Sequence, residues 1–259
     1  MDLGQIRTSI DQVDRDLVEL LNRRFDLVDK VGLYKYIEGL EIENKDRESY
    51  IKDRLINDYD SKDGAILDIF EEIFAVSKAR QAKHFASYKE LQEECKKKKE
   101  NIILVGMPGS GKTTIGKKLA YFLCRDFIDI DEVIYKENKS KPGEIIEKYG
   151  ESHFRSLESD ALKRVLKEQG KVIATGGGIL TKDENLTYIK NPTNIVYYID
   201  RNLDELAIDG RPLSQGGPQV LKELYKKRNI RYETICDLKI FNEDIYDTIY
   251  TIAKHYLTI

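Results

Sequence analysis

Apolar residues recur at helical spacing through the first third of the chain. From residue 3 to about residue 36 they stand three or four positions apart, without a proline, which predicts one long helix. Two further periodic segments run from about residue 45 to 58 and from about residue 63 to 89 or beyond. The first helix is too long to be covered by the other two, so the pattern predicts an all-α, three-helix bundle that a second copy completes.

The pattern changes after residue 100. Short apolar runs alternate there with helical stretches, which predicts a three-layer α/β/α domain with a parallel sheet of about five strands. The expected strands span residues 102–105, 127–130, 172–175, 195–199 and 238–240. Ligands of such sheets bind at the carboxyl ends of the strands, so the residues that follow each strand are the candidates for chemistry.

A charged segment at residues 88–100 separates the two patterns. Its glutamates come early and its lysines late, which matches the polarity of a helix C-terminus and predicts an exposed tail of the third helix. A basic nucleic-acid patch is the alternative, but the flanking acids disfavour it. We therefore expect an all-helical domain at residues 1–95 and an α/β domain at residues 99–259.

One glycine-rich stretch lies directly after the first expected strand. Residues 106–113, GMPGSGKT, fit the phosphate-loop pattern G-x-x-x-x-G-K-[ST], and a helix is expected to follow. The glycines let backbone N–H groups curl around phosphate oxygens, Lys112 adds a full positive charge, and Thr113 can ligate magnesium. A tight turn that is glycine-rich by chance is the alternative, which the complete motif disfavours. The stretch predicts a nucleotide phosphate site.

Two aspartates follow the second expected strand. In an extended segment Asp129 and Asp131, at i and i+2, would point the same way beside the phosphate loop. One can hold magnesium through water while the other orients a substrate hydroxyl. The alternative is that they cap the next helix.

Three weaker signals come later in the chain. The glycine triplet at residues 176–178 follows the third strand, although alone it is only a turn signal. The stretch from residue 201 to 220 has little apolar content and predicts a mobile lid that brings Arg211 over the phosphates; a passive surface loop would look similar. Arg228 and Tyr232 lie one turn apart on the helix that follows.

This ordered set of motifs resembles shikimate kinase, a P-loop kinase, over nearly all of residues 101–245. Two further parts of the resemblance are Gly150-Glu151 followed by Phe154-Arg155 and Glu158, and Arg211-Pro212-Leu213. The segment before Arg211 lacks the arginine that many members place against the adenine. The resemblance implies transfer of the γ-phosphoryl group of ATP, with Mg²⁺, to the 3-hydroxyl of shikimate. Another small hydroxy acid such as gluconate is the alternative acceptor.

The same resemblance implies roles for individual residues. Shikimate would be bound by Asp131, Arg155, Gly177, Gly178 and Arg228. ATP would be bound by Gly109, Ser110, Gly111, Lys112, Thr113, Thr114 and Arg211. Magnesium would be held by Thr113 and Asp129, and the catalytic residues would be Lys112, Asp131 and Arg211.

Polar residues on the first three helices form a second pattern. Arg24 and Lys35 are eleven residues apart, which at about 100° per residue returns them to nearly the same face. Arg7 falls roughly 100° away from Arg24 and would naturally reach a partner's pocket in a dimer. Ser77 and Gln81, at i and i+4, lie one above the other. Any one of these polar residues on a helix is usually a solvated side chain, so only the whole set of residues supports a functional interpretation.

That pattern resembles the all-helical chorismate mutase family over essentially the whole of residues 1–95. The matching residues are Arg7, Arg24, Lys35, Arg47, Glu48, Ser77 and Gln81, with Asn44 where many members carry an aspartate. The implied reaction is the rearrangement of chorismate to prephenate, which needs no cofactor. The three arginines would hold the two carboxylates and Glu48 would accept from the ring hydroxyl, while Lys35 and Gln81 would hydrogen-bond the ether oxygen.

The two resemblances together imply a bifunctional enzyme of aromatic amino-acid biosynthesis that dimerises through its helical domain. A non-catalytic chorismate or prephenate sensor that regulates the kinase is the alternative for residues 1–95.

Composition narrows the remaining possibilities. The net charge of -3 argues against a nucleic-acid or membrane-surface footprint. No apolar run approaches a membrane span, and the N-terminus has no basic region followed by an apolar one, so a cytoplasmic protein is expected. The 3 cysteines are scattered, which predicts free thiols.

Overall fold

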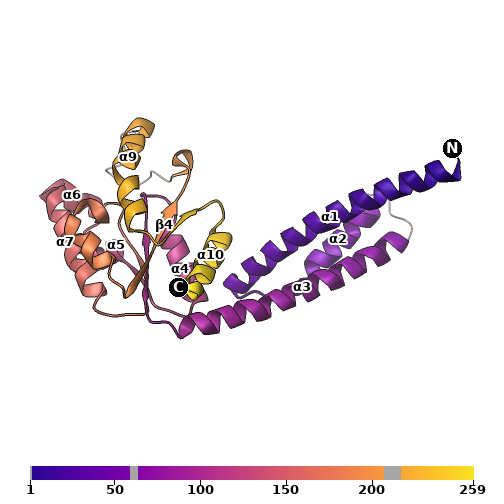
Figure 1. The fold of residues 1–259 in the computed structure, drawn as a ribbon, viewed down its shortest axis with the longest axis horizontal. Coiled ribbons are helices and arrows are strands. Elements are labelled where there is room, and N and C mark those ends of the chain that lie inside the picture. The colour runs from indigo at the N-terminus through magenta and orange to yellow at the C-terminus, as the bar shows by residue number, and fades with distance from the viewer. Residues whose placement is uncertain (1, 59–63, 207–216) are drawn as a thin grey trace. The chain divides into compact units, whose positions relative to one another are not determined.

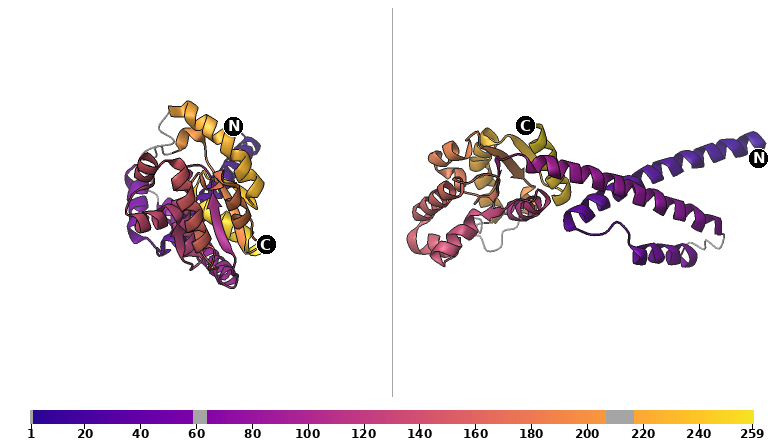
Figure 2. Two further views of the ribbon diagram at one scale, coloured as in Figure 1. Left: turned by 90° about the vertical axis from the view of Figure 1, so that its left-hand side faces the viewer. Right: turned by 90° about the horizontal axis from the view of Figure 1, so that it is seen from below.

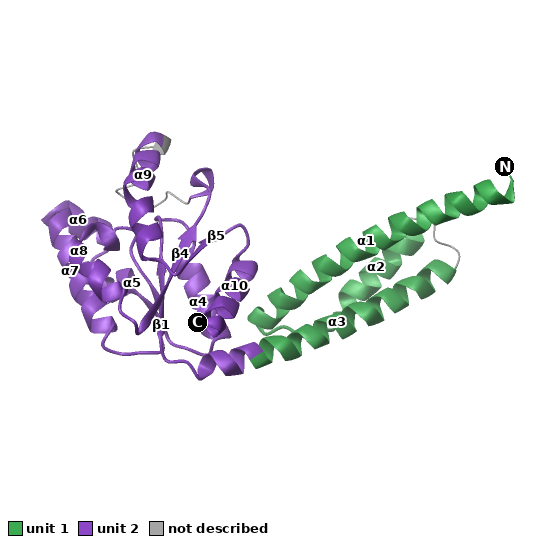
Figure 3. Ribbon diagram, viewed as in Figure 1, with its two compact units in different colours: residues 1–90 green, residues 91–259 purple. Residues whose placement is uncertain are grey.

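The computed structural model describes residues 2–58, 64–206 and 217–259, which form two compact units (Figure 3). The first unit is Met1–Glu90 and the second is Leu91–Ile259. The division falls several residues before the boundary expected near residue 98. None of the helices in the described ranges is both long enough and apolar enough to cross a bilayer.

Three helices make up the first unit, as the periodicity predicts. They are α1 (Leu3–Glu38), α2 (Lys45–Asn57) and α3 (Gly64–Lys96), the last of which continues into the second unit (Figure 1). Helix α1 begins in a capping box between Asp2 and Gln5 and ends at Gly39, whose φ of 67° suits a left-handed C-cap. The sequence therefore encodes both ends of this long helix.

Helices α1 and α3 run in the same direction, with α2 returning beside them (Figure 2). Their contacts advance together along both helices: Asp29 pairs with Arg80 at 2.6 Å, and the ring of Tyr36 packs edge-on against Phe85 at 5.2 Å. These contacts all involve the second half of α1, so this half is partly covered within one copy of the chain, although Leu27 and Val31 remain exposed.

The first half of α1 carries an uncovered apolar face. Leu3 is 63% exposed and Leu17 is 50% exposed, and the apolar positions between them are similarly open. No described element of the same copy packs on this face. This agrees with the expectation that α1 is too long for the other two helices to cover.

The second unit contains a five-stranded parallel sheet in the order β2-β3-β1-β4-β5. The strands are β1 (Asn101–Val105), β2 (Phe127–Asp129), β3 (Val172–Ala174), β4 (Asn194–Asp200) and β5 (Leu238–Phe241). Both faces of the central strands are buried, which is why these strands are continuous apolar runs rather than alternating ones. The expected fold class and number of strands are confirmed.

Helices cover both faces of the sheet (Figure 1). One face carries α4 (Lys112–Phe122) and α10 (Ile245–Thr258). The other carries α5 (Ile130–Asn138), α6 (Pro142–Tyr149), α7 (Glu151–Val165), α8 (Asp183–Ile189) and α9 (Gly217–Ile235), with short 3₁₀ turns η1 (Ile179–Thr181) and η2 (Leu203–Glu205). Because all five strands are parallel, their carboxyl ends lie at the same edge of the sheet.

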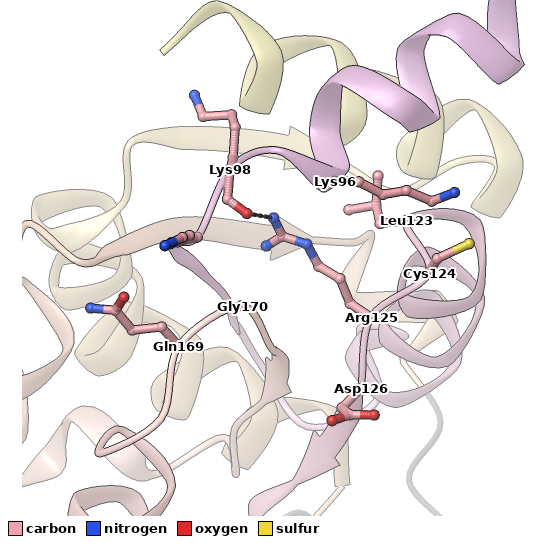
Figure 4. A pocket seen from close by; sticks show the side chains of 9 residues that line it. Lys96, Lys98, Leu123, Cys124, Arg125, Asp126, Gln169 and Gly170 are labelled. Carbon is pink, nitrogen blue, oxygen red and sulfur yellow. Dashed lines mark hydrogen bonds between the residues drawn. The ribbon is translucent and has the colours of Figure 1, made fainter.

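The last residues of α3, from residue 91 to Lys96, belong to the second unit. Cys95 is fully buried. The guanidinium of Arg125 donates to the backbone carbonyls of Cys95 at 3.0 Å, Lys98 at 2.6 Å and Glu100 at 2.8 Å. Figure 4 shows the bond to Lys98. The helix continues to Lys96 as expected and most of its last residues are exposed or half-buried, with Cys95 as the exception. Arg125, from a loop distant in the sequence, satisfies the carbonyl of Cys95 near the end of the helix, a contact that local sequence does not reveal.

A cavity of about 360 Å³ lies beside this arginine, between the end of α3 and the loop before β2. Because the guanidinium of Arg125 is bound to backbone carbonyl oxygens, we assign this arginine a structural role and do not interpret the cavity as a ligand site. The three cysteines are free thiols, as expected.

Candidate active sites

A cleft of about 560 Å³ opens at the carboxyl ends of the strands in the second unit. It is lined by the phosphate loop after β1, by residues after β2, β3 and β4, and by side chains of α7 and α9. The predicted residues that line it are Gly109, Gly111, Lys112, Thr113, Thr114, Asp129, Asp131, Arg155, Gly177, Gly178 and Arg228. The structure thus brings together side chains that are far apart in the sequence.

The phosphate loop has a conformation that requires glycine. Gly106 has φ 146°, and a Cβ atom there would lie 2.3 Å from the carbonyl oxygen of Ile199. Lys112 is buried, and its ammonium donates to the carbonyls of Gly106 at 2.9 Å and Met107 at 2.8 Å. These carbonyls hold the positive charge of Lys112 within the loop, at the N-terminus of α4, where a phosphate is favoured.

Asp129 performs two tasks at the end of β2. Its Oδ2 accepts from the Thr113 hydroxyl at 2.7 Å, and its Oδ1 accepts from the backbone N–H of Asp131 at 2.9 Å. The second bond caps α5, which begins at Ile130. The expected extended Asp129–Asp131 segment is therefore wrong, because capping turns the chain into a helix at once. Both carboxylates still line the cleft.

Two arginines occupy the other end of the cleft. Arg155 is 7% exposed and pairs with Glu151 at 2.7 Å and Glu158 at 2.5 Å. Arg228 is 8% exposed and donates to the carbonyl of Gly177 at 2.9 Å. Burial, helped by the charge of Arg155, lowers the pKa of Arg228. Two buried guanidinium groups near one cleft make a site for an anionic group of the ligand.

The glycine triplet is more than a turn. A Cβ atom at Gly176 would lie 2.3 Å from Oε1 of Glu158, and one at Gly178 would lie 2.2 Å from Cζ of Arg155. The backbone therefore passes so close to this charged pair that larger residues would displace it. The hydroxyl of Tyr232 also donates to the carbonyl of Gly177.

Glu158 was not predicted as a site residue, yet it lies at the centre of the charged group. It is 1% exposed, and burial raises its pKa to about 7 although Arg155 opposes the shift. Its Oε1 has no hydrogen-bond partner among the described residues. The available signal was its position three residues after Arg155, one helical turn along α7.

Other predicted and unpredicted residues complete the cleft. Ser110 is buried in the loop, and its carbonyl accepts from the side chain of Asn242 at 2.9 Å. Lys141 and Arg201 line the cleft but were not predicted. Arg211, which the sequence places in a lid, lies outside the described residues.

A second group of predicted residues gathers in the helical unit. Arg24 of α1 donates to the Ser77 hydroxyl of α3 at 2.7 Å, and burial lowers the pKa of this arginine. Gln81, one turn after Ser77, is buried against α1, where a Cβ atom at Gly32 would lie 3.2 Å from its Cγ. Close packing of α1 and α3 at this glycine brings the polar side chains together.

Lys35 and Glu48 complete this group. The ammonium of Lys35 donates to the carbonyl of Ile42 at 2.6 Å. Burial lowers the pKa of Lys35, and the nearby charge of Glu48 partly offsets the shift. Glu48 also pairs with Lys78 at 3.3 Å, a residue that the sequence pattern did not single out.

Three predicted residues lie at the margin of the group or away from it. Asn44 caps α2 by accepting from the N–H of Arg47 at 2.9 Å. The exposed Arg47 lies 5.1 Å above the ring of Tyr50. Arg7 is exposed near the start of α1 and, at 1.5 Å rise per residue, is roughly 25 Å along the helix from Arg24. A single copy therefore does not bring Arg7 to the others.

Comparison with known proteins gives these two sites a family context. Residues 108–257, more than half of the chain, match the family model described as shikimate kinase. The chain belongs to the shikimate kinase family. Residues 6–82 match the model described as chorismate mutase type II. The expectation of a chorismate mutase domain joined to a shikimate kinase domain is confirmed by these matches.

Individual relatives of the shikimate kinase domain agree. The chain is 37% identical over 155 residues to a shikimate kinase of Clostridium botulinum, covering 58% of this chain and 93% of the relative. A solved shikimate kinase from Acinetobacter baumannii, in complex with shikimate, is 32% identical with a TM-score of 0.59, covering 61% of this chain and 93% of the other. Shikimate kinase from Aquifex aeolicus is 30% identical with a TM-score of 0.54, covering 61% and 96%.

Proposed function

We propose that residues 91–259 transfer the γ-phosphoryl group of ATP to a hydroxyl of shikimate. The observation that carries the proposal is the pair of buried guanidinium groups, Arg155 and Arg228, in the same cleft as the phosphate loop. The loop end suits a nucleotide, and the arginine end suits an acceptor that bears a carboxylate. Arg155 already pairs with Glu151 and Glu158, whereas Arg228 forms no salt bridge with a carboxylate among the described residues. A neutral polyol would leave the charge of Arg228 without a counter-ion, which is costly.

Each residue then has a task that follows from its place. Lys112, held by loop carbonyls, donates to phosphate oxygens when nucleotide binds and neutralises charge as the phosphoryl group moves. Asp131 also lines the cleft, and its carboxylate would orient the acceptor hydroxyl and take its proton. Catalysis is mainly positioning and electrostatic stabilisation.

Asp129, at the end of β2, and Thr113, at the start of α4, supply oxygen atoms that suit a magnesium ion. The Thr113 hydroxyl and the Asp129 carboxylate are 2.7 Å apart beside the phosphate loop, and oxygen donors of this kind are the ligands that magnesium prefers. Bound there with the nucleotide, the ion would neutralise charge on the phosphates. Thr113 and Asp129 would hold and orient it, directly or through water.

A substrate panel tests the kinase proposal. The purified chain, supplied with MgATP, should release ADP with shikimate and much less with gluconate or a neutral polyol. Arg155→Met should raise the KM for shikimate while leaving the KM for ATP nearly unchanged. Efficient phosphorylation of gluconate without phosphorylation of shikimate would overturn the proposed acceptor.

For the helical unit we propose the rearrangement of chorismate to prephenate. The carrying observations are three contacts between neighbouring helices: Arg24 with Ser77, Gln81 beside Gly32, and the charge of Glu48 acting on Lys35. A unimolecular rearrangement needs a restrained substrate and donors placed where charge develops, and these side chains supply both. Conversion of chorismate by the purified chain, followed by its absorbance, tests this directly.

We also propose that two copies pair through α1. The exposed apolar residues of α1 repeat in a heptad pattern, at Leu3, Ile6, Ile10, Val13, Leu17, Leu20, Leu27 and Val31. A heptad seam of this kind packs against a second helix. Arg24 falls on the same seam and Arg7 beside it, so the mutase site lies at the proposed interface, where the partner's Arg7 can complete it.

Mixing two inactive variants tests this shared site. Arg7→Ala and Lys35→Ala should each lose mutase activity, and co-refolding them should restore a fraction of it. In a mixed dimer one site then receives an intact Lys35 from one copy and an intact Arg7 from the other. Absence of any recovery, with dimers present by mass, would contradict a site built from two copies.

A further inference from the structure

Two consecutive residues of α3 each hold one side chain from another helix. Ser77 accepts from Arg24 of α1 at 2.7 Å. Lys78 reaches Glu48 of α2, with its Nζ 3.3 Å from Oε1 and 3.4 Å from Oε2. Ser77 belongs to the set implied by the mutase resemblance, whereas Lys78 does not.

We infer that Lys78 is a positioning residue of the mutase site, which holds the Glu48 carboxylate on α3 and away from the ammonium of Lys35. This inference rests on the proposed mutase activity. Glu48 is expected to accept from the ring hydroxyl and Lys35 to donate to the ether oxygen, and both tasks require that the two side chains not neutralise each other.

The surroundings of Glu48 explain why its side chain needs a partner that restricts its conformation. It lies in the first turn of α2, a short helix. Among the described residues of this helix, Leu55 alone is buried. The side chain of Glu48 is 24% exposed and has rotamer freedom to lose. A charge-assisted contact with both carboxylate oxygens restricts that freedom.

Lys35 is the competing partner. The charge of Glu48 acts on Lys35 strongly enough to offset part of the effect of burial on its pKa. Lys35 is otherwise held by the carbonyl of Ile42. Without Lys78, the Glu48 carboxylate loses its cationic partner on α3 and moves toward Lys35. The ammonium of Lys35 then binds Glu48 and is no longer available to the ether oxygen of the substrate.

The chain offers a matched control for a purely structural role. Lys52 of α2 and Glu71 of α3 form a second ion pair between the same two helices, at 2.5 Å and more exposed than the first. Glu71→Gln breaks this pair and leaves Lys52 in place. That choice matters because Lys52 also senses the charge of Glu48.

The test measures mutase kinetics in the full chain. Lys78→Met should lower kcat for chorismate about tenfold with a smaller change in KM, the scale of a partly buried ion pair acting on a transition-state donor. Lys78→Arg should recover most of the loss, Glu71→Gln should match the wild type, and the kinase rate should be unchanged in all three. A wild-type rate in Lys78→Met, or an equal loss in Glu71→Gln, would overturn the inference.

A double variant separates positioning from direct binding. If Lys78 acts through Glu48, adding Lys78→Met to Glu48→Gln should cause no further loss, because the cycle is non-additive. A repeated tenfold loss in the Glu48→Gln background would mean that Lys78 contacts the substrate itself, which contradicts the inference. A wild-type chain that does not convert chorismate would instead overturn the proposed mutase function, and this inference with it.

Discussion

The kinase cleft and the mutase site are assembled in opposite ways. In the kinase cleft, loops that follow parallel strands meet at one edge of a sheet, and the key arginines Arg155 and Arg228 are buried and paired within one chain. In the mutase site, side chains from three helices gather on a face that remains partly open, and Arg7 lies far from the rest. A sheet brings its loops together by topology, whereas the three helices leave one face of α1 open, on which we propose that a second copy packs.

The difference has an energetic cause. The sheet is covered by helices on both faces, so the second unit has an interior that can hold charged pairs such as Arg155 and Glu158. The helical unit buries few large side chains and leaves a long apolar face of α1 open. Dimerisation would remove that face from water at about 25 cal/mol per Å². Stability and activity of the helical unit should therefore depend on the same contact.

The largest effect is expected at the phosphate loop. Lys112→Ala should reduce ATP-dependent phosphorylation of shikimate by about a thousandfold or more, since it removes the charge that faces the phosphates. Prephenate formation should be unchanged, because the helical unit makes no use of the loop. Coupled assays of ADP release and chorismate loss measure both, with Lys117→Ala, exposed on the same helix, as the control. Loss of both activities in a folded chain would contradict the prediction that the two sites act independently.

The reverse experiment is expected to have a somewhat smaller effect. Lys35→Ala should lower the mutase rate by about a hundredfold or more, because a donor to the ether oxygen is lost in the transition state. The kinase rate should be that of the wild type. Exposed Lys83 of α3 provides a matched control, since Lys83→Ala should affect neither rate. A fall in the kinase rate with Lys35→Ala would indicate that the helical unit regulates the kinase.

A pH experiment probes the buried charges of the kinase cleft. Folding raises the pKa of Glu158 from 4.5 to about 7, so its contribution to the free energy of unfolding is largest below about pH 4.5 and is lost as the pH rises through 7. The loss amounts to about 3 kcal/mol. In urea titrations the stability of Glu158→Gln should therefore rise relative to the wild type across this window. A constant difference between the two proteins would show that Glu158 is ionised throughout.

The smallest effect is expected at Arg125, within the second unit. Arg125→Met removes three hydrogen bonds to backbone carbonyls and should lower the stability of the kinase by about 2 kcal/mol. The urea concentration at which half of the kinase activity is lost measures this. Neither kcat should change in the absence of urea. An unchanged midpoint would mean that the end of α3 adds nothing to the kinase fold.

The sequence predicted most of the architecture because the informative signals are local. Strand β1, the phosphate loop and the start of α4 follow one another within a few residues, so periodicity and glycine spacing define them together. The uncovered face of α1 was likewise evident from helical periodicity. The resemblance then ordered the remaining kinase residues, and most of them line one cleft.

The failures have both local and tertiary origins. The Asp129–Asp131 segment turns into α5 because Asp129 caps that helix, a local contact that the spacing allowed as the alternative. The bond from Arg125 to the carbonyl of Cys95 joins residues that are distant in the sequence. Glu158 was named only as part of the resemblance and not as a site residue, because its position one turn after Arg155 does not reveal that both side chains are buried. Lys78 was missed because its partner Glu48 lies on another helix. Contacts between distant residues have no signature in the spacing of a single sequence.

The most direct test of the account is a pair of assays on one preparation of the full chain, one with shikimate and MgATP and one with chorismate alone. We predict turnover in both, with neither substrate altering the rate at the other site. Turnover in only one assay, or a rate at one site that changes with the substrate of the other, would contradict the claim that the chain carries two independent active sites.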